Sequence, residues 1–235
     1  MKKLFVLSFT AFVALLAVQT TTADVIADWN FQSAVSTNNI IGAGLTPSST
    51  QSGVLADIGT GTASAFHATA ATAWSIPAGN GSANSWSANN WSVGDYYQFS
   101  VSTVNYSGIT LSYDQTGSNT GPKDYGLAYS LNGSSFTTFG SYSITNDSWS
   151  VTVPKSISNH AYDLSAVTTL DNAATVYFRV VDLDTTAINN TTVATTGTGR
   201  IDNFIVSATP VPEPSIIALA ALGSGACLLG FRRRR

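Results

Sequence analysis

Residues 97–133 read YQFSVSTVNYSGITLSYDQTGSNTGPKDYGLAYSLNG and hold the strongest structural signal of the chain. Apolar and polar residues alternate in three runs within this stretch, at 97–102, 109–114 and 124–131. A period of two places one face of a strand on a core and the other face in water. The pair Asn132-Gly133 then favours a type I′ hairpin turn. The stretch therefore predicts consecutive antiparallel strands that end in a hairpin.

Further strand signals lie on both sides of this stretch. Apolar runs at 25–31, 176–181 and 201–206 are typical of strands. The region 42–90 is rich in Ser, Thr, Gly and Ala, which indicates short strands joined by long loops. No segment between the two chain ends keeps a helical period over three turns. We therefore predict an all-β fold, an antiparallel β-sandwich that forms one domain over residues 24–208.

The charge distribution restricts the possible partners of this domain. Charged residues make up only 10% of the chain, well below the quarter that is usual in soluble domains. Six of the ten basic residues lie at the two ends, whereas all thirteen acidic residues lie between Asp24 and Glu213. The middle thus has four basic and thirteen acidic residues, a formal net charge of −9. Such a domain offers no basic surface to a phosphate backbone, which argues against nucleic acid as a partner.

The N-terminus has the pattern of a secretory signal peptide. Met1-Lys2-Lys3 is followed by an uncharged apolar run at 4–18 and then by small and polar residues up to Ala23. This order predicts a signal peptide over residues 1–23, with cleavage after Ala23. A transmembrane anchor is the alternative, but the run is shorter than the ~20 residues that a bilayer requires.

The C-terminus has three parts in a fixed order. A linker at 209–215 contains Pro212-Glu213-Pro214, whose prolines keep the chain extended. The uncharged apolar run at 216–231 predicts a transmembrane helix of ~24 Å. The basic tail at 232–235 favours insertion of this helix with its basic end cytoplasmic. It consists of Arg232, Arg233, Arg234 and Arg235.

This C-terminal order resembles the PEP-CTERM sorting signal of Gram-negative bacteria that make exopolysaccharide, and the resemblance covers residues 211–235. It implies recognition by an exosortase, a membrane-embedded cysteine transpeptidase that cuts near Pro212-Glu213-Pro214. The protein would then contact the inner membrane only transiently, through residues 216–231, before it reaches the cell surface or the extracellular space. In that case the four arginines at 232–235 are a stop-transfer signal, and Cys227, the only cysteine, is an apolar filler. A plain C-terminal membrane anchor is the alternative.

Short motifs in the domain resemble the β-sandwich domains that are often found ahead of such tails. These motifs are Asp28-Trp-Asn-Phe31, Tyr129-Ser-Leu-Asn-Gly133 and Gly199-Arg-Ile-Asp-Asn-Phe204. In those domains a first strand with an aromatic residue and a last strand with Asp-Asn close a jelly roll. The resemblance therefore implies a jelly-roll-like sandwich, and it implies no activity.

The signatures of common catalytic sites are missing from the chain. It has no G-x-S-x-G elbow, no H-E-x-x-H motif and no P-loop. The histidines His67 and His160 have no local motif around them, although a triad could assemble in space. Glu213 is the only glutamate, so a glycosidase would need a pair of aspartates, and nothing singles out such a pair. We therefore predict that the domain is not an enzyme and assign no catalytic residue.

Calcium is the one cofactor that the sequence suggests, because Ca²⁺ prefers carboxylate and carbonyl oxygens. Asp28 on the expected first strand could meet Asp202 and Asn203 on the last strand if these two strands pair. Jelly-roll carbohydrate-binding domains often place a structural calcium ion at such a junction. The alternative is that these side chains form turns or bond to neighbouring backbone groups.

Two tryptophans invite a sugar-binding hypothesis, because exposed aromatic rings stack on pyranose faces. Trp86 and Trp91 lie in a polar stretch, but their spacing puts them on opposite faces of a regular strand. Aromatic residues in all-β domains are more often part of the core, and we favour that placement.

The sequence thus predicts a non-enzymatic component of the cell surface or of the extracellular matrix, associated with exopolysaccharide or biofilm. A carbohydrate-binding module with a structural calcium ion and a secreted hydrolase of unfamiliar type are the alternatives.

Overall fold

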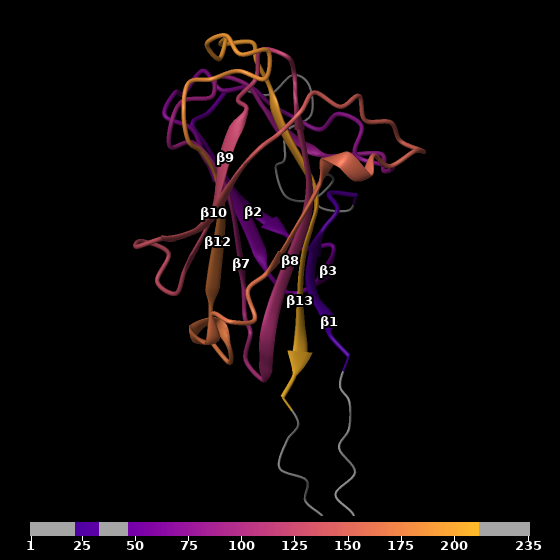
Figure 1. Ribbon diagram of the computed structural model, residues 1–235, viewed down its shortest axis with the longest axis vertical. Coiled ribbons are helices and arrows are strands. Elements are labelled where there is room, and N and C mark those ends of the chain that lie inside the picture. The colour runs from indigo at the N-terminus through magenta and orange to yellow at the C-terminus, as the bar shows by residue number, and fades with distance from the viewer. Residues whose placement is uncertain (1–21, 33–46, 212–235) are drawn as a thin grey trace, which may run out of the picture.

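Two antiparallel sheets lie face to face in the computed structural model, which describes residues 22–32 and 47–211 (Figure 1). The strand order of the first sheet is β11-β8-β13-β1-β3, and β6 pairs with β13 while β5 pairs with β6. Its strands are β1 (Asp24–Trp29), β3 (Ile58–Gly59), β5 (Trp74–Ser75), β6 (Trp86–Ala88), β8 (Tyr106–Gly117), β11 (Asn159–Asp163) and β13 (Gly199–Pro210).

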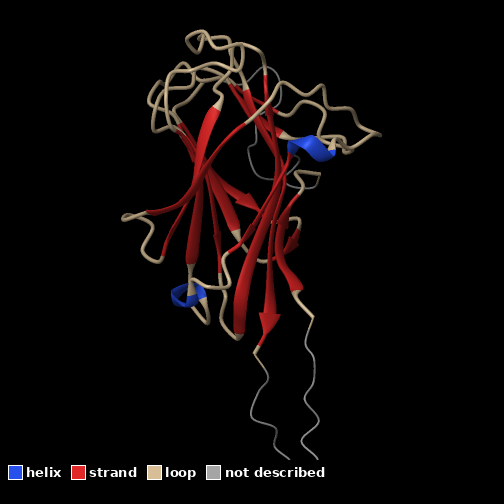
Figure 2. Ribbon diagram, viewed as in Figure 1, coloured by secondary structure: helices blue, strands red, loops and turns tan. Residues whose placement is uncertain are grey.

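The second sheet has the order β10-β9-β12-β7-β4-β2. Its strands are β2 (Thr50–Leu55), β4 (Thr62–Phe66), β7 (Tyr96–Val101), β9 (Asp124–Ser130), β10 (Thr137–Ser143) and β12 (Val176–Asp182). The only helices among the described residues are two 3₁₀ turns, η1 (Ser156–Ser158) and η2 (Thr168–Leu170), and all other connections are loops (Figure 2). The all-β, antiparallel β-sandwich that the sequence predicted is confirmed, whereas the jelly-roll connectivity stays a prediction.

The alternating run at 97–102 became β7, a strand with one buried face. Tyr97, Phe99 and Val101 of β7 are buried, whereas the residues between them are partly exposed. Rings from the two sheets meet in the core, where Phe99 of β7 stacks on Phe204 of β13 with ring centroids 3.7 Å apart. The period-two pattern held in β7, whereas β8 is buried on both faces at 113–117 and β9 at 125–128. Leu131, expected on the inner face of the third run, is 48% exposed.

The turn after β9 differs from the type I′ turn that the sequence predicted. The hairpin itself is present, because β9 and β10 pair in antiparallel register. A type I′ turn needs a positive φ at both central residues, but only Gly133 of the pair has one, at +70°. The connection is longer, and side chains hold it: Ser130 Oγ accepts hydrogen bonds from the backbone N–H groups of Asn132 and Gly133.

The first and last strands of the domain pair with each other. Asp24 at the start of β1 lies opposite Ala208 near the end of β13, so both ends of the domain lie at one end of the sandwich (Figure 1). The predicted signal peptide at 1–23, apart from its last two residues, and the predicted transmembrane helix at 216–231 lie outside the described residues. Within the described ranges, no helix has the length and apolar character that crossing a membrane requires.

Candidate functional site

Asp202 and Asn203, two of the three predicted calcium ligands, lie at an irregular point of β13. The register of β13 against β8 shifts between Asp202 and Ile205, and Asn203 has a φ of +49°. Asp202 Oδ2 accepts hydrogen bonds from the backbone N–H of Asn80 and from the Ser82 hydroxyl, both at 2.8 Å. Burial raises the pKa of the Asp202 carboxyl to about 7. Asp202 thus holds the loop before β6 against the first sheet.

Asp28, the third predicted ligand, does not lie opposite Asp202 or Asn203 in the sheet. The strands β1 and β13 pair as the calcium hypothesis required, but Asp28 lies opposite Ile205, whereas Asp202 lies opposite Asp114 of β8. Burial, together with the nearby Asp57, raises the pKa of Asp28 to about 6. Among residues 22–32 and 47–211, no group of three or more His, Cys, Asp or Glu side chains is placed to hold a metal ion. The calcium ion stays a prediction that this geometry does not support.

Trp86 and Trp91 belong to the core, as we favoured, and the alternative that they form a sugar platform is wrong. Trp86 is 0% exposed and Trp91 is 6% exposed. Trp91 Nε1 donates a hydrogen bond to the backbone oxygen of Ala88 at 2.9 Å, and its ring packs against Tyr97. Indoles buried in this way present no free face to a sugar.

Both histidines are at least partly buried, and each packs against aromatic rings. His67 is fully buried between Trp74 and Trp91, and its Nδ1 lies 3.4 Å from Asp95 Oδ2. Burial lowers the pKa of His67 to about 4, so its imidazole is neutral near neutral pH. His160 of β11 is partly buried, and its ring packs against Tyr142 with ring centroids 4.3 Å apart.

The outward side of β4 and β7 carries a cluster of aromatic and polar side chains that the sequence did not single out. We name this surface the β4–β7 face. Three residues of β4 lie directly opposite three residues of β7 in register. The pairs are Phe66 with Tyr96, Ser64 with Gln98, and Thr62 with Ser100. Phe66 is 40% exposed, and its ring stacks beside Tyr96 with centroids 5.7 Å apart.

Arg179 of β12 borders this face and is held by uncharged groups. Its Nε donates to Gln98 Oε1 at 2.8 Å, and its Nη2 donates to the Tyr96 hydroxyl at 3.1 Å. The guanidinium carbon lies 3.8 Å from the ring centroid of Tyr96 and 3.7 Å from that of Phe136. The cation is therefore enclosed between two rings, an arrangement that fixes the neighbouring Tyr96 ring.

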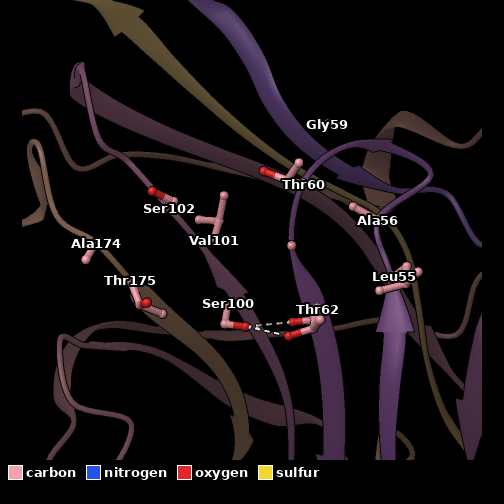
Figure 3. Close-up of a pocket in the computed structure, with 11 residues that line it drawn as sticks. Leu55, Ala56, Gly59, Thr60, Thr62, Ser100, Val101, Ser102, Ala174 and Thr175 are labelled. Atoms are coloured by element: carbon pink, nitrogen blue, oxygen red, sulfur yellow. Dashed lines mark hydrogen bonds between the residues drawn. The ribbon is translucent and has the colours of Figure 1, made fainter.

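The hydroxyl end of the β4–β7 face opens into a pocket of about 470 Å³. Thr62 Oγ1 and Ser100 Oγ lie 2.8 Å apart at its edge, and Ser100 Oγ also donates to the backbone oxygen of Thr62 (Figure 3). Further hydroxyl groups in the lining come from Thr60, Ser102 and Thr175. Small residues and hydroxyls dominate the pocket, so it offers many hydrogen-bonding groups and no ionisable side chain.

The sequence contained only a weak signal for this surface. The outward positions of β7 were visible as the polar half of an alternating strand, but the alternation says nothing of the strand beside it. Phe66 lies 30 positions before Tyr96, and Arg179 lies 83 positions after Tyr96. Only the order of the strands in the second sheet brings the three residues together.

Comparisons with known proteins identify the C-terminal tail. Residues 210–235 match the model of the PEP-CTERM protein-sorting motif. No curated protein matches the chain.

Solved structures with a similar fold include adhesin domains and a carbohydrate-binding module. The K2 cleaved adhesin domain of Lys-gingipain is 13% identical with a TM-score of 0.40, and the match covers 76% of this chain and 96% of that one. The K1 domain, from Porphyromonas gingivalis W83, is 15% identical with a TM-score of 0.35. That match covers 80% of this chain and 98% of the other. TmCBM61 in complex with β-1,4-galactotriose is 12% identical with a TM-score of 0.29. That match covers 67% of this chain and 81% of the other.

TM-scores below 0.5 identify neither a ligand nor an activity for this chain. The motif match is specific, and it confirms the sorting tail that the sequence predicted. The chain thus carries a PEP-CTERM sorting motif behind an all-β, antiparallel sandwich, and this motif marks it for export to the cell surface or beyond.

Proposed function

We propose that this chain is an exosortase-processed component of the cell surface or of the extracellular polysaccharide matrix, and that its β-sandwich acts without catalysing a reaction. The observation that carries the proposal is the sorting motif at residues 210–235. Exosortase cuts near Pro212-Glu213-Pro214, and the four arginines at 232–235 hold the tail in the inner membrane until that cut. The domain is then released or re-attached outside, among exopolysaccharide.

The placement of the titratable groups supports a role without catalysis. His67 is fully buried, so it has no access to a substrate. The aspartate pair that lies in register across β8 and β13, Asp114 and Asp202, is also buried, at 7% and 0% exposed. The amide of Asn203 donates to Asp114 Oδ2 at 2.8 Å. A carboxyl pair in a glycosidase must flank a sugar with room for it, and these two carboxyls are enclosed by the protein instead.

Intact-mass analysis of the protein from its native host tests the sorting proposal. We expect the wild-type strain to yield a protein that has lost both residues 1–23 and the end of the tail. A strain without exosortase is expected to yield a protein that keeps the tail. A tail retained in both strains would mean that residues 216–231 are a plain membrane anchor.

The hydrolase alternative predicts turnover, and the same protein preparation tests it. We expect no release of reducing ends from polysaccharides and no cleavage of model esters. Turnover that disappears on changing His160 or Asp114 would overturn the non-enzymatic part of the proposal and leave the sorting part intact.

A second candidate function, carbohydrate binding, is favoured by one specific observation. The β4–β7 face combines an exposed ring with a row of hydrogen-bonding side chains, which is the usual composition of a ligand site.

A further inference from the structure

The β4–β7 face has the shape of a strip that runs along two strands. The outward residues follow each other at every second position, from Phe66 and Tyr96 at one end to Thr62 and Ser100 at the other. The five residues from Thr62 to Phe66 are separated by four steps, which span about 13 Å. Thr62 and Ser100, at the hydroxyl end of the strip, also line the pocket (Figure 3). A ligand that matches this strip is therefore elongated.

The aromatic end of the strip suits the flat side of a sugar ring. Phe66 is 40% exposed, and its ring lies side by side with that of Tyr96 at an interplanar angle of 27°. The electron-rich face of an aromatic ring attracts the C–H bonds on the flat side of a pyranose. Arg179 packs on Tyr96 and bonds to its hydroxyl, so this ring has a fixed orientation before any ligand arrives.

The remaining length of the strip suits hydroxyl groups. Gln98 Nε2 lies 3.4 Å from Ser64 Oγ, and the hydroxyls of Thr62 and Ser100 bond to each other at 2.8 Å. These side chains are partly or fully exposed, so each keeps donors or acceptors that a ligand can use. Amide and hydroxyl groups in a row beside a stacking ring can orient a chain of sugars.

The loop between β9 and β10 packs against Arg179 and Tyr177 of β12, at the border of the strip. Asn132 Oδ1 accepts hydrogen bonds from the backbone N–H groups of Ser134 and Ser135, both at 2.9 Å. These bonds position Phe136, whose ring covers the guanidinium of Arg179 at 3.7 Å. The loop also covers Tyr177, since Gly133 packs against that ring. Phe66 and Thr62 of the strip remain exposed.

The charges on and around the strip favour a neutral ligand. The six outward residues of the strip carry no charge, and Arg179 at its border is enclosed by two rings and already donates from Nε and Nη2. Between Asp24 and Val211 the chain holds four basic and twelve acidic residues. A polyanion would therefore be repelled by the domain and would find no free cation on the strip.

We propose that the β4–β7 face binds a neutral polysaccharide, with one pyranose stacked on Phe66 and the following sugars hydrogen-bonded along Gln98, Ser64, Thr62 and Ser100. This proposal rests on the proposed function, because it names the kind of matrix polymer with which the exported protein associates. It assigns the contact to side chains on the outside of the second sheet and none to the buried Trp86 and Trp91.

Affinity electrophoresis of the protein purified from its host tests the proposal. The native gels contain galactan, mixed-linkage β-glucan, xylan or glucomannan as neutral probes, and alginate as the anionic probe. We expect at least one neutral probe to retard the wild-type protein and alginate to leave it unretarded. Binding through hydrogen bonds and ring contacts predicts nearly the same affinity at low and high salt.

Two substitutions on the strip and one matched control locate the site. Phe66→Ala and Gln98→Ala are each expected to weaken binding at least about tenfold. Phe139→Ala removes a ring of similar exposure, 37%, from the edge strand β10 and is expected to bind like wild type. Thermal melts of all three variants show whether each remains folded.

Several results would overturn the proposal. These are the absence of retardation by every neutral probe, retardation by alginate alone, or equal binding by wild type and the folded Phe66→Ala and Gln98→Ala variants. None of these results depends on the tail, so the sorting proposal is tested separately by intact mass. A protein that keeps its tail in both strains can still bind a neutral polysaccharide.

Discussion

Phe204 shows how one residue joins the two layers of the molecule. Its ring is fully buried and stacks on Phe99 of the opposite sheet at an interplanar angle of 4°. Tyr113, a neighbour in its own sheet, stacks on it with ring centroids 5.4 Å apart, and Trp29 contacts it at 6.0 Å. A side chain with partners in both sheets stabilises the sandwich as a unit, because its loss would open a cavity between the layers.

Substituting Phe204 tests this role. Phe204→Ala is expected to lower the free energy of unfolding by about 3–5 kcal/mol, from lost burial and the remaining cavity. Chemical denaturation followed by tryptophan fluorescence measures the change. Phe204→Leu keeps most of the volume and is expected to cost clearly less. Equal losses for both variants would mean that the ring stacking matters more than the filled space.

At the same scale, sequence reasoning predicted inward residues better than outward ones. The rings of Tyr97 and Phe99 were expected on the core because a strand of period two has one apolar side, and both are buried. The contacts of Phe66 and Arg179 were not predictable, because they depend on which strands become neighbours. Asp28 illustrates the same limit: the calcium hypothesis required its strand to pair with the last strand, which it does, but the register places Asp28 opposite Ile205.

The connection between β9 and β10 is a loop whose form the local sequence did not predict. Its sequence contains Asn-Gly, which predicted a tight turn, yet six residues separate the two strands. Hydrogen bonds that backbone N–H groups donate to the side-chain oxygens of Ser130 and Asn132 replace those of a tight turn. Turn type therefore depended on side-chain bonds that no dipeptide rule includes.

Gly133 is the residue of this element whose replacement we expect to matter. Its φ of +70° is unfavourable for other residues, and a Cβ there would lie 3.2 Å from the Tyr177 ring. Gly133→Ala is expected to destabilise the protein by about 1–2 kcal/mol. Gly140→Ala on β10 is the control, because a Cβ there meets nothing within 4 Å, and we expect a change within about 0.5 kcal/mol. Urea denaturation compares the two; equal stabilities would refute the strain at Gly133.

Buried carboxyls give the whole molecule an unusual dependence on pH. Burial raises the pKa of both Asp182 and Asp202 to about 7, and neighbouring aspartates add to the effect at Asp182. A carboxyl whose pKa is higher in the folded state stabilises the fold when it is protonated. This stability is complete below the unfolded pKa and is lost as the pH rises through the folded one. His67 acts in the opposite direction, and its contribution fades as the pH rises through its unfolded pKa of about 6.5.

Between pH 6.5 and pH 8 we therefore expect the melting temperature to fall as the pH rises. Each unit of pKa shift corresponds to about 1.4 kcal/mol of stability. Asp182→Asn removes one of the two titrating groups and is expected to flatten the slope. Differential scanning calorimetry at several pH values measures both proteins. A melting temperature that stays level or rises over this range in the wild type would contradict the assignment.

For the whole molecule, the sequence predicted the cellular destination better than the arrangement of the strands. Export and sorting were predictable because their signals are local: an apolar run, Pro-Glu-Pro and terminal arginines. The fold class was predictable from repeated alternation. The region of β2 to β6 was not placed, because these strands are two to six residues long and β2 has an irregular register. Such strands are defined mainly by their neighbours.

The position of β13 links folding to the order of export. This strand lies between β8 and β1 in the first sheet and is the last strand among the residues that the structure describes. A chain that crosses the membrane from its N-terminus would deliver β13 only after every other strand, and the sorting motif follows directly. The first sheet thus cannot close until the tail has reached the membrane. In that order β13 would cross directly ahead of the sorting motif, and a chain truncated before residue 199 would lack both its central strand and its sorting signal.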